Sequence, residues 1–331
     1  MTRAKTLVIG ASHWHAPLYA DRIAAQHDVL GLSDADPASV KNLAVLWDAP
    51  LYSSWEELLS RHQDAELAYV FVPHDTMRDV CLALIALRVP LVVEKPVGVS
   101  LQELIDVREA AEAARVPVAV PLVQRGGPAD SWLAKAGRSV YESAQFIAGP
   151  PDRYLTNGSP WMVDPERAGG GCLINLAPHF IDLFLHSSGA KRAAVTAALS
   201  STLHRSNVED YASLTLTTEE GRIATIQVGY AFPESPLKRH CAYTRIGAAG
   251  TSTIWSDGSA SFAPIDGDSE VAQINVDSDP LYGAFVDEVA GQLDRGFQDL
   301  PGIRDLEATM TVIWDAYEFA KRGGTGVHTQ H

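Results

Sequence analysis

The chain has 331 residues, 46% of them hydrophobic and 20% charged, which is typical of a soluble globular protein long enough for two domains. Its formal net charge of -15 repels phosphate backbones and anionic lipid, so nucleic acid and membrane surfaces are not expected as partners. Three widely spaced cysteines, and an early apolar run broken by Gly10 and Ser12, predict a cytoplasmic protein without disulfides or signal peptide.

The first predicted strand, "KTLVIG" at 5–10, runs into a turn at Gly10. A dinucleotide-binding turn follows the pattern G-x-G-x-x-G, and here Ser12 and His15 stand at the second and third glycine positions. Pro17 predicts that the following helix begins late. These residues are compatible with either a degenerate phosphate-binding turn or an ordinary strand-to-helix turn. A metal site at His13 and His15 is not expected, because no cysteine or acidic ligand lies nearby in the sequence.

The second predicted strand ends at Asp34, 24 residues after Gly10, where an acidic side chain would accept a hydrogen bond from a ribose hydroxyl. Further strands are predicted at 67–73, 90–96 and 116–122, with amphipathic helices between the strands. This alternation predicts a doubly wound parallel sheet that binds ligands at the carboxyl ends of its strands.

The motif "EKP", residues 94–96, follows one of these apolar strands. Charged side chains at the carboxyl end of a parallel strand point into the ligand crevice. Lys95 there could donate hydrogen bonds to a hydroxyl substrate or exchange a proton. The alternative is a surface ion pair at a strand end.

After about Gln124 the pattern changes. Runs between 192 and 263, separated by turn signals, predict a largely antiparallel sheet, and helices are expected near 281–295 and 303–321. The tail "RGGTGVHTQH" is expected to fray. The domains predicted are 1–123, a dinucleotide-binding domain, and 124–331, a substrate-binding and oligomerisation domain.

The stretch "AGGGCLINLAPHFIDLF", 168–184, begins with three glycines that permit a close approach to a cofactor or to another helix. Asn175, His179 and Asp182 share one helical face, although Pro178 should kink or restart the helix. His179 is a candidate proton acceptor or a structural histidine. Asp182 could hold the His179 ring or cap a neighbouring element.

Together these features resemble the Gfo/Idh/MocA oxidoreductase family over nearly the whole chain. The resemblance rests on Gly10 and Asp34, "VPHDT" at 72–76, "EKP" at 94–96, "GGGCLINLAPHFID" at 169–182, "VEDYASLTL" at 208–216 and the closing "AYEFAKRGG". It implies an α/β protein with an amino-terminal Rossmann domain and a carboxyl-terminal domain built on a large, mostly antiparallel open sheet.

The resemblance also implies hydride transfer between a nicotinamide and a hydroxyl or carbonyl of a sugar, inositol or related small molecule. NAD is expected rather than NADP, because Asp34 would repel a 2′-phosphate. By this resemblance Lys95, His179 and Asn175 are the catalytic residues, with His179 as general base; Asn175 stands where many members have aspartate. Residues expected to hold the cofactor are Gly10, Ser12, His13, Trp14, Asp34, Pro73, His74, Glu94 and Lys95.

Substrate contacts are expected from Lys95, Arg125, Tyr154, Trp161, Asn175 and His179, although the aromatic and arginine side chains could equally be packing or surface. The polar face of "DYASLTLTT" and the resemblance together predict a homodimer or homotetramer. Two other functions stay open: an NAD-dependent glycosidase of the same family, and a non-catalytic regulator that senses a nucleotide.

Overall fold

The computed structural model describes residues 3–232 and 239–323, and it forms two compact units. The first unit contains the chain up to Pro121 together with Tyr154–Gly169 and Asp279–Glu307. The second unit contains Leu122–Arg153, Gly170–Ser278 and the chain from Ala308 onward. The division at residues 123 and 124 stays a prediction, and each unit is assembled from separate stretches of sequence. Most of the tail expected to fray lies outside the described residues.

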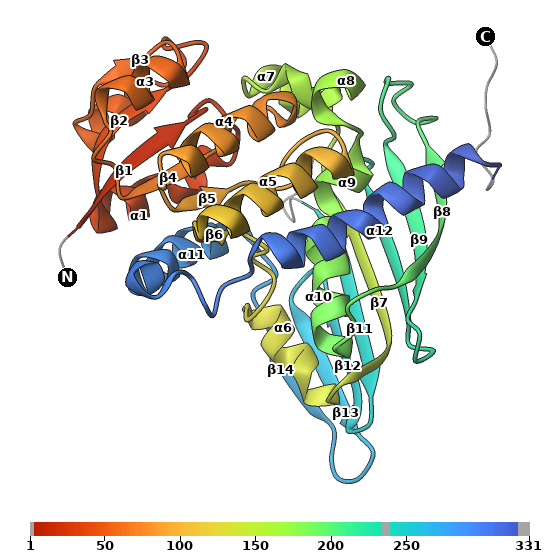
Figure 1. Cartoon of the computed structure of the whole chain (residues 1–331). Coiled ribbons are helices and arrows are strands. Elements are labelled where there is room, and N and C mark those ends of the chain that lie inside the picture. The colour runs from red at the N-terminus through yellow and green to blue at the C-terminus, as the bar shows by residue number, and fades with distance from the viewer. Residues whose placement is uncertain (1–2, 233–238, 324–331) are drawn as a thin grey trace. The chain divides into compact units, whose positions relative to one another are not determined.

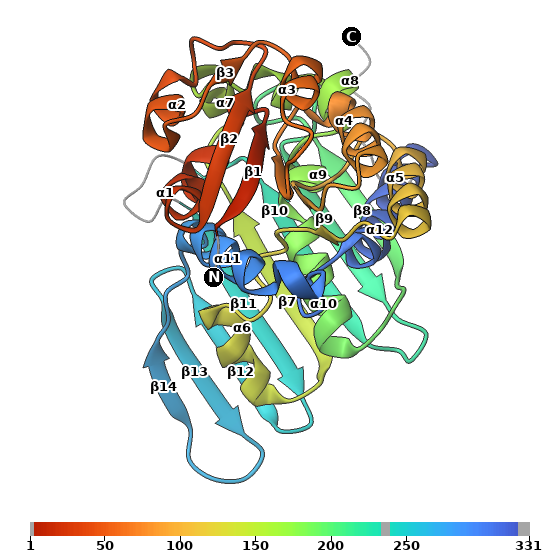
Figure 2. The same ribbon diagram turned by 60° about the vertical axis from the view of Figure 1, so that its left-hand side comes forward.

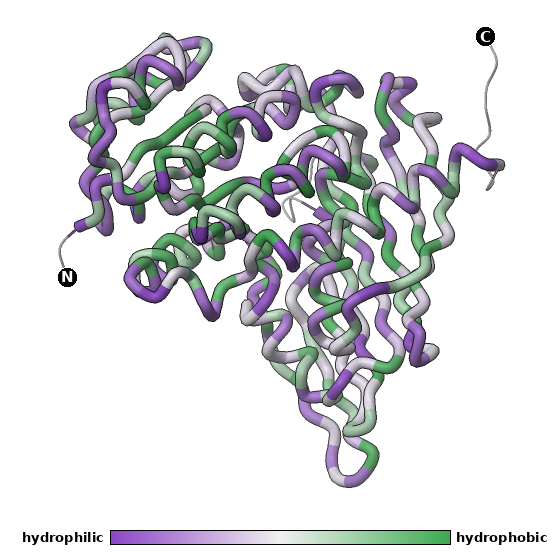
Figure 3. The backbone as a smooth tube through the Cα atoms, viewed as in Figure 1, coloured by the Kyte–Doolittle hydropathy of each residue, from purple (hydrophilic) through white to green (hydrophobic). Residues whose placement is uncertain are grey.

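A six-stranded parallel sheet forms the centre of the first unit, in the order β3-β2-β1-β4-β5-β6 (Figure 1). Its strands are β1 (Ala4–Ile9), β2 (His27–Ser33), β3 (Leu51–Tyr52), β4 (Leu67–Val70), β5 (Leu91–Val93) and β6 (Val118–Ala119). Most residues of these strands are apolar and buried, as in a sheet covered on both faces, and the tube drawn through β1 is hydrophobic along much of its length (Figure 3). The doubly wound parallel sheet is therefore confirmed.

Helices follow the strands in the expected alternation. Those of the amino-terminal part are α1 (Ala16–Gln26), α2 (Lys41–Trp47), α3 (Trp55–Arg61), α4 (His74–Ala86) and α5 (Leu101–Ala114). Ser54 and Ser100 cap α3 and α5, because each hydroxyl accepts a hydrogen bond from a backbone N–H in the first turn of its helix.

Two later stretches of the chain complete the first unit. One contains the 3-10 helix Pro160–Val163 and α8 (Pro165–Ala168), and begins within α7 (Asp152–Thr156). The other contains α11 (Asp279–Gln292), which packs against α1, where Arg22 pairs with Asp287. The sequence gives no local sign of this arrangement, because contacting residues such as His74 and Ala168 are 94 positions apart and Arg22 and Asp287 are 265 positions apart.

An eight-stranded sheet forms the second unit, in the order β14-β13-β12-β11-β7-β10-β9-β8 (Figure 2). Its strands are β7 (Ser139–Ile147), β8 (Ala194–Ser200), β9 (Tyr211–Thr217), β10 (Ile223–Gly229), β11 (His240–Gly247), β12 (Gly250–Trp255), β13 (Ser259–Pro264) and β14 (Glu270–Gln273). Every neighbouring pair is antiparallel except β10 with β7. The large, mostly antiparallel sheet is confirmed.

One face of this sheet is covered by helices. α9 (Cys172–Leu176) and α10 (Pro178–Ser188) pack on β7, β9 and β10, and α6 (Pro128–Leu133) packs on β12. The last helix is α12 (Ile303–Lys321), so both closing helices lie near their predicted positions. The core of the second unit lies between these helices and the sheet, and alternate side chains of the strands are buried in it.

Within the described residues, no single helix is long and apolar enough to cross a membrane. Residues Pro165–Leu176 and Pro178–Ser188 reach the required length and composition only as a bent pair. Most of α10 is buried.

Candidate active site

The turn after β1 requires glycine at residue 10. Gly10 has φ of +79°, and a Cβ there would lie 2.5 Å from the backbone nitrogen of Val72. The turn is closed by hydrogen bonds from His13 N–H to the Gly10 carbonyl and from Ala16 N–H to the His13 carbonyl. α1 begins at Ala16 with Pro17 in its first turn, so the late helix start is confirmed.

Asp34 lies at the end of β2 and is joined to this turn. Its Oδ2 accepts the Ser12 backbone N–H at 2.7 Å, and its Oδ1 accepts the Asp36 N–H at 2.9 Å. A carboxylate has about four acceptor positions, so Asp34 keeps acceptor capacity for a hydroxyl group. Asp34 and Ser12 therefore meet at the carboxyl edge of the sheet, where a doubly wound fold binds its ligand.

Aromatic rings surround His13 in the first unit. The His13 ring centroid lies 5.9 Å from that of Trp14, 6.2 Å from Phe71 and 5.8 Å from Trp161. Tyr154 meets the Trp14 ring edge-on at 5.8 Å. Tyr154 and Trp161, expected at the substrate, therefore pack beside the residues of the dinucleotide turn.

The hydrogen bonding of His13 fixes its tautomer. Its Nδ1 accepts the backbone N–H of His15 at 3.0 Å, and burial lowers the pKa of His13 well below its usual value. The neutral ring therefore carries its proton on Nε2, which is a hydrogen-bond donor.

Glu94 and Lys95 are both buried, with only 1% and 4% of their surfaces exposed. The alternative of a surface ion pair is therefore wrong. Glu94 Oε1 accepts hydrogen bonds from the Tyr19 hydroxyl at 2.7 Å and from His15 Nδ1 at 2.9 Å. Burial lowers the pKa of Lys95 to about 8, although the charge of Glu94 acts in the opposite direction.

His74 follows Pro73 at the start of α4 and is held from a distant part of the chain. Its Nδ1 donates to the carbonyl of Ala168 at 2.7 Å, and its ring meets Trp161 edge-on at 4.7 Å. Burial lowers the pKa of His74 to about 3. The side chain is therefore a neutral donor at physiological pH, and a weaker proton acceptor than an ordinary histidine.

The glycine run lies in the second unit and packs against protein atoms. A Cβ at Gly170 would overlap the Tyr317 hydroxyl of α12, and one at Gly171 would overlap the Glu209 carbonyl. Glu209 Oε1 accepts the N–H groups of Gly171 and Leu173 and the Tyr317 hydroxyl. For Gly170 the partner is thus another helix, and Glu209 caps the start of α9.

Asn175 and His179 lie on the two helices that follow these glycines. Pro178 restarts the helix as α10, as predicted. The buried Asn175 donates from Nδ2 to the Tyr230 hydroxyl at 3.0 Å, while His179 is half-buried. Asn175 is thereby bound to the sheet, because Tyr230 directly follows β10.

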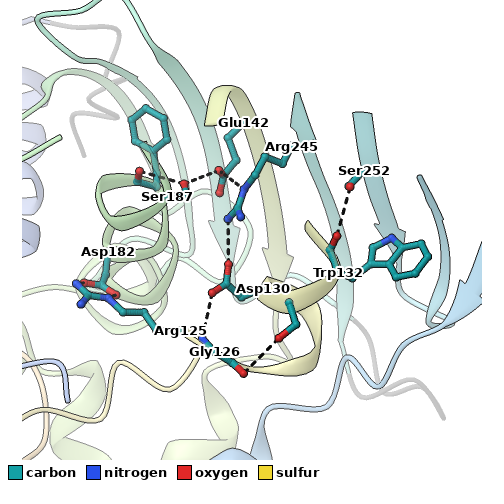
Figure 4. A network of polar contacts seen from close by, with 11 residues as sticks. Arg125, Gly126, Asp130, Trp132, Glu142, Asp182, Ser187, Arg245 and Ser252 are labelled. Atoms are coloured by element: carbon teal, nitrogen blue, oxygen red, sulfur yellow. Dashed lines mark hydrogen bonds and ion pairs between the residues drawn. The ribbon is translucent and has the colours of Figure 1, made fainter. Parts of the chain in front are cut away.

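Arg125 is bound to α10 through Asp182. The Arg125 Nε donates to Asp182 Oδ2 at 2.7 Å, and a second bond joins Nη2 to Oδ1 (Figure 4). Planar two-bond pairs of this kind hold both side chains in one orientation. Asp182 thus holds the loop that carries Arg125.

A buried arginine fixes the same loop from the other side. Arg245 of β11 donates to Glu142 at 3.0 Å and to Asp130 at 3.2 Å, and Asp130 accepts the Gly126 N–H (Figure 4). Ser187 of α10 donates to Glu142. The network joins the sheet, α6 and α10, so it stabilises the position of the helix that carries His179.

The structure therefore groups the predicted residues in two sets. The first unit holds Gly10, Ser12, His13, Trp14, Asp34, Pro73, His74, Glu94, Lys95, Tyr154 and Trp161, and the second holds Arg125, Asn175 and His179. Sequence reasoning missed Tyr19, Glu209 and Tyr230 as partners. Tyr19 left a signal because it lies one helical turn after His15, and Glu209 left one because it lies within the quoted motif "VEDYASLTL". Among the described residues, no three histidine, cysteine or acidic side chains are grouped to hold a metal ion.

Comparisons with known proteins agree with this architecture. A model described as the oxidoreductase family with an NAD-binding Rossmann fold matches residues 4–122, and a model of the GFO/IDH/MocA C-terminal domain matches residues 136–252. A protein of Amycolatopsis mediterranei named for the oxidoreductase subunit of a UDP-kanosamine synthase is 30% identical over 168 residues. That match covers 48% of this chain and 44% of that protein, so the chain spans less than half of this relative.

Solved structures share the fold over nearly the whole chain. UDP-N-acetylglucosamine 3-dehydrogenase GnnA from Acidithiobacillus ferrooxidans is 16% identical, with a TM-score of 0.79 over 98% of this chain and 100% of that chain. An inositol dehydrogenase homolog from Azotobacter vinelandii, complexed with NAD+, is 16% identical, with a TM-score of 0.81 over 98% and 97% of the two chains.

Proposed function

Because the chain belongs to the Gfo/Idh/MocA family of NAD-binding oxidoreductases, we propose that it transfers a hydride between NAD and a hydroxyl or carbonyl carbon of a sugar, inositol or related small molecule. The observation that carries the proposal is Lys95. It is a buried lysine with a lowered pKa at the carboxyl end of β5, in the same unit as the dinucleotide turn. Perturbed lysines in such positions are typical of catalytic sites. The names of the relatives, which include UDP-sugar and inositol enzymes, support the substrate class.

The residues of the first unit fit NAD. Gly10 keeps the turn free of a side chain, Ser12 offers a hydroxyl, and Asp34 offers acceptors for ribose hydroxyl groups. The neutral His13 adds an Nε2 donor beside the same turn. Bound NAD supplies the carbon that accepts or donates the hydride. Glu94 Oε1 accepts hydrogen bonds from His15 and Tyr19, and the cofactor contact expected of Glu94 stays a prediction.

The chain's own residues supply the remaining chemistry. Lys95, largely protonated at pH 7, stabilises negative charge on the reacting oxygen. His179 takes the hydroxyl proton as general base, and Asn175, held by Tyr230, orients the substrate. His74 is a weaker candidate for the base, because its pKa is lowered to about 3. Arg125, Tyr154 and Trp161 remain candidates for substrate contacts.

The decisive experiment is a substrate screen. Purified protein is mixed with NAD and with sugars, inositols, sugar acids and UDP-sugars, and the absorbance of reduced nicotinamide is followed. We expect net NADH formation with at least one class. Release of a sugar leaving group without net NADH would instead identify a glycosidase. Nucleotide binding with no reaction on any class would favour a regulator.

NAD should bind more tightly than NADP, because the Asp34 carboxylate repels a 2′-phosphate. Asp34→Asn keeps one acceptor for the Ser12 or Asp36 N–H but removes the charge, so it should reduce the preference for NAD over NADP about tenfold. Fluorescence titration of both nucleotides measures the ratio. Asp36→Asn, an exposed neighbour, is the matched control and should leave the ratio unchanged. Tighter binding of NADP by the unaltered protein would contradict the assignment of Asp34.

We also propose that the chain forms a homo-oligomer through the sheet face opposite α9 and α10. Three large apolar side chains form a row there, because Tyr141 pairs with Ile223 on one side and with Ile246 on the other. Tyr141 is 51% exposed, and Trp255 of β12, also outward-facing, is 55% exposed. Such faces mark interaction surfaces. Light scattering at micromolar concentration should give at least twice 35.7 kDa, and Tyr141→Lys should lower that mass.

A further inference from the structure

His15 stands where a G-x-G-x-x-G turn has its third glycine, and its ring forms a hydrogen bond with Glu94. The His15 Nδ1 lies 2.9 Å from Glu94 Oε1, and the Tyr19 hydroxyl lies 2.7 Å from the same oxygen. All three side chains are buried. A glycine at this position could make no such contact, so the substitution joins the dinucleotide turn to the "EKP" motif.

The partners fix the direction of both hydrogen bonds. An ionised carboxylate only accepts, so the tyrosine hydroxyl and the His15 Nδ1–H must both donate. Burial alone would raise the pKa of Glu94, but the His15 hydrogen bond and nearby positive charge outweigh it and lower the pKa. The Glu94 N–H also donates to the Val70 carbonyl at 3.1 Å. Backbone and side chain of Glu94 are thus both held, directly before Lys95.

We propose that His15 and Tyr19 are positioning residues that act through Glu94, holding its carboxylate ionised and fixed so that the adjacent Lys95 keeps its charge and its place. The inference rests on the function proposed for Lys95 and adds to it the residues that prepare this lysine. Neither His15 nor Tyr19 need touch substrate or cofactor for this role.

Other titratable groups surround this cluster. His13 lies in the same turn, its ring centroid 5.2 Å from that of His15, and His74 interacts electrostatically with Glu94 from α4. From α11, the Tyr282 ring lies 4.5 Å from His15, and Asp279 acts on its charge. Tyr69 of β4 meets Tyr19 edge-on at 6.2 Å. His13, His15 and His74 have lowered pKa values because of burial, so Lys95 and Glu94 carry the opposing charges near neutral pH.

The test is a double-mutant cycle between Tyr19→Phe and Glu94→Gln. Glu94→Gln should lower kcat about 10²-fold. Tyr19→Phe should lower kcat about tenfold, while its Kd for NAD stays within about twofold of the original value. Because Tyr19 acts through Glu94, the double variant should lose no more than Glu94→Gln alone. Losses that multiply in the double variant would overturn the proposal.

Tyr69→Phe is the matched control. Tyr69 is equally buried in the same aromatic cluster, but its hydroxyl pairs with His27 at 3.0 Å instead of Glu94. It should leave kcat near its original value even if thermal stability falls. Equal losses of kcat from Tyr69→Phe and Tyr19→Phe would show that packing alone is responsible, and the proposal would fail.

A second readout needs no substrate. The sequence contains seven lysines, so the ¹³Cε resonance of Lys95 can be assigned by comparison with Lys95→Met and titrated in the ligand-free protein. Glu94→Gln should lower the midpoint from about 8 by about one pH unit, and Tyr19→Phe should lower it by less. Failure of the substrate screen would reject the proposed function only. An unchanged midpoint in both variants would reject the link between Glu94 and Lys95.

Discussion

Replacing His179 with alanine should lower kcat about 10²- to 10⁴-fold, the usual scale for loss of a general base. Hydride can leave a carbinol carbon only as the hydroxyl proton is removed, and a histidine is a suitable acceptor near neutral pH. His179 is half-buried on α10, a helix held by the Arg125–Asp182 pair and the Arg245 network. Steady-state kinetics with the best substrate of the screen provide the measurement.

Two further variants separate chemistry from folding. His179→Asn keeps a polar side chain that cannot accept the proton, so it should lose as much kcat as alanine. His186→Ala removes an exposed histidine from the same helix and should keep kcat. If His179→Ala turns over at a near-normal rate, the base lies elsewhere in the protein.

Local periodicity was sufficient to predict most strands of the two sheets. Apolar runs such as 67–70 and 91–93 are buried on both faces, while β9 alternates between buried and exposed residues. Strand β7 was missed, because it lies outside the 192–263 region where the antiparallel runs were expected. The assembly of the first unit could not be predicted in this way. Tyr154–Gly169 and Asp279–Glu307 join it through contacts such as His74 with Ala168, which no short window of sequence contains.

The candidate site likewise contains residues that could be predicted from the sequence and contacts that could not. Gly10, Asp34 and Lys95 were found because their spacing follows strand ends, and the structure places them at those ends. The buried position of Glu94 could not be predicted from the "EKP" motif. The donors to its carboxylate are Tyr19 of α1 and His15 of the turn before α1, which are distant in the sequence. The partners of Gly170 and Gly171 likewise come from α12 and the segment before β9, so the glycines alone could not distinguish a cofactor from a helix.

Lys95→Met should lower kcat by about 10² to 10³, the scale for loss of one donor that stabilises developing negative charge. Methionine keeps the length and apolar stem of lysine, so it suits the buried position. The Kd for NAD should change little, because Gly10, Ser12 and Asp34 remain. Kinetics and a fluorescence titration with NAD together separate lost chemistry from lost cofactor binding. Lys41→Met, on the exposed surface of α2, is the control and should change neither quantity.

The pH dependence of the unaltered enzyme tests the same lysine without a mutation. Burial lowers the pKa of Lys95 to about 8, and the protonated form is the active one. Activity that depends on this charge is therefore present below pH 8 and lost as the pH rises through that value, with about nine-tenths of the lysine charged at pH 7 and about one-tenth at pH 9. A profile of kcat that stays flat to pH 10 would mean that Lys95 is not the titrating group. Glu94→Gln should shift this loss of activity to lower pH, because without the neighbouring carboxylate only burial acts on the Lys95 ammonium.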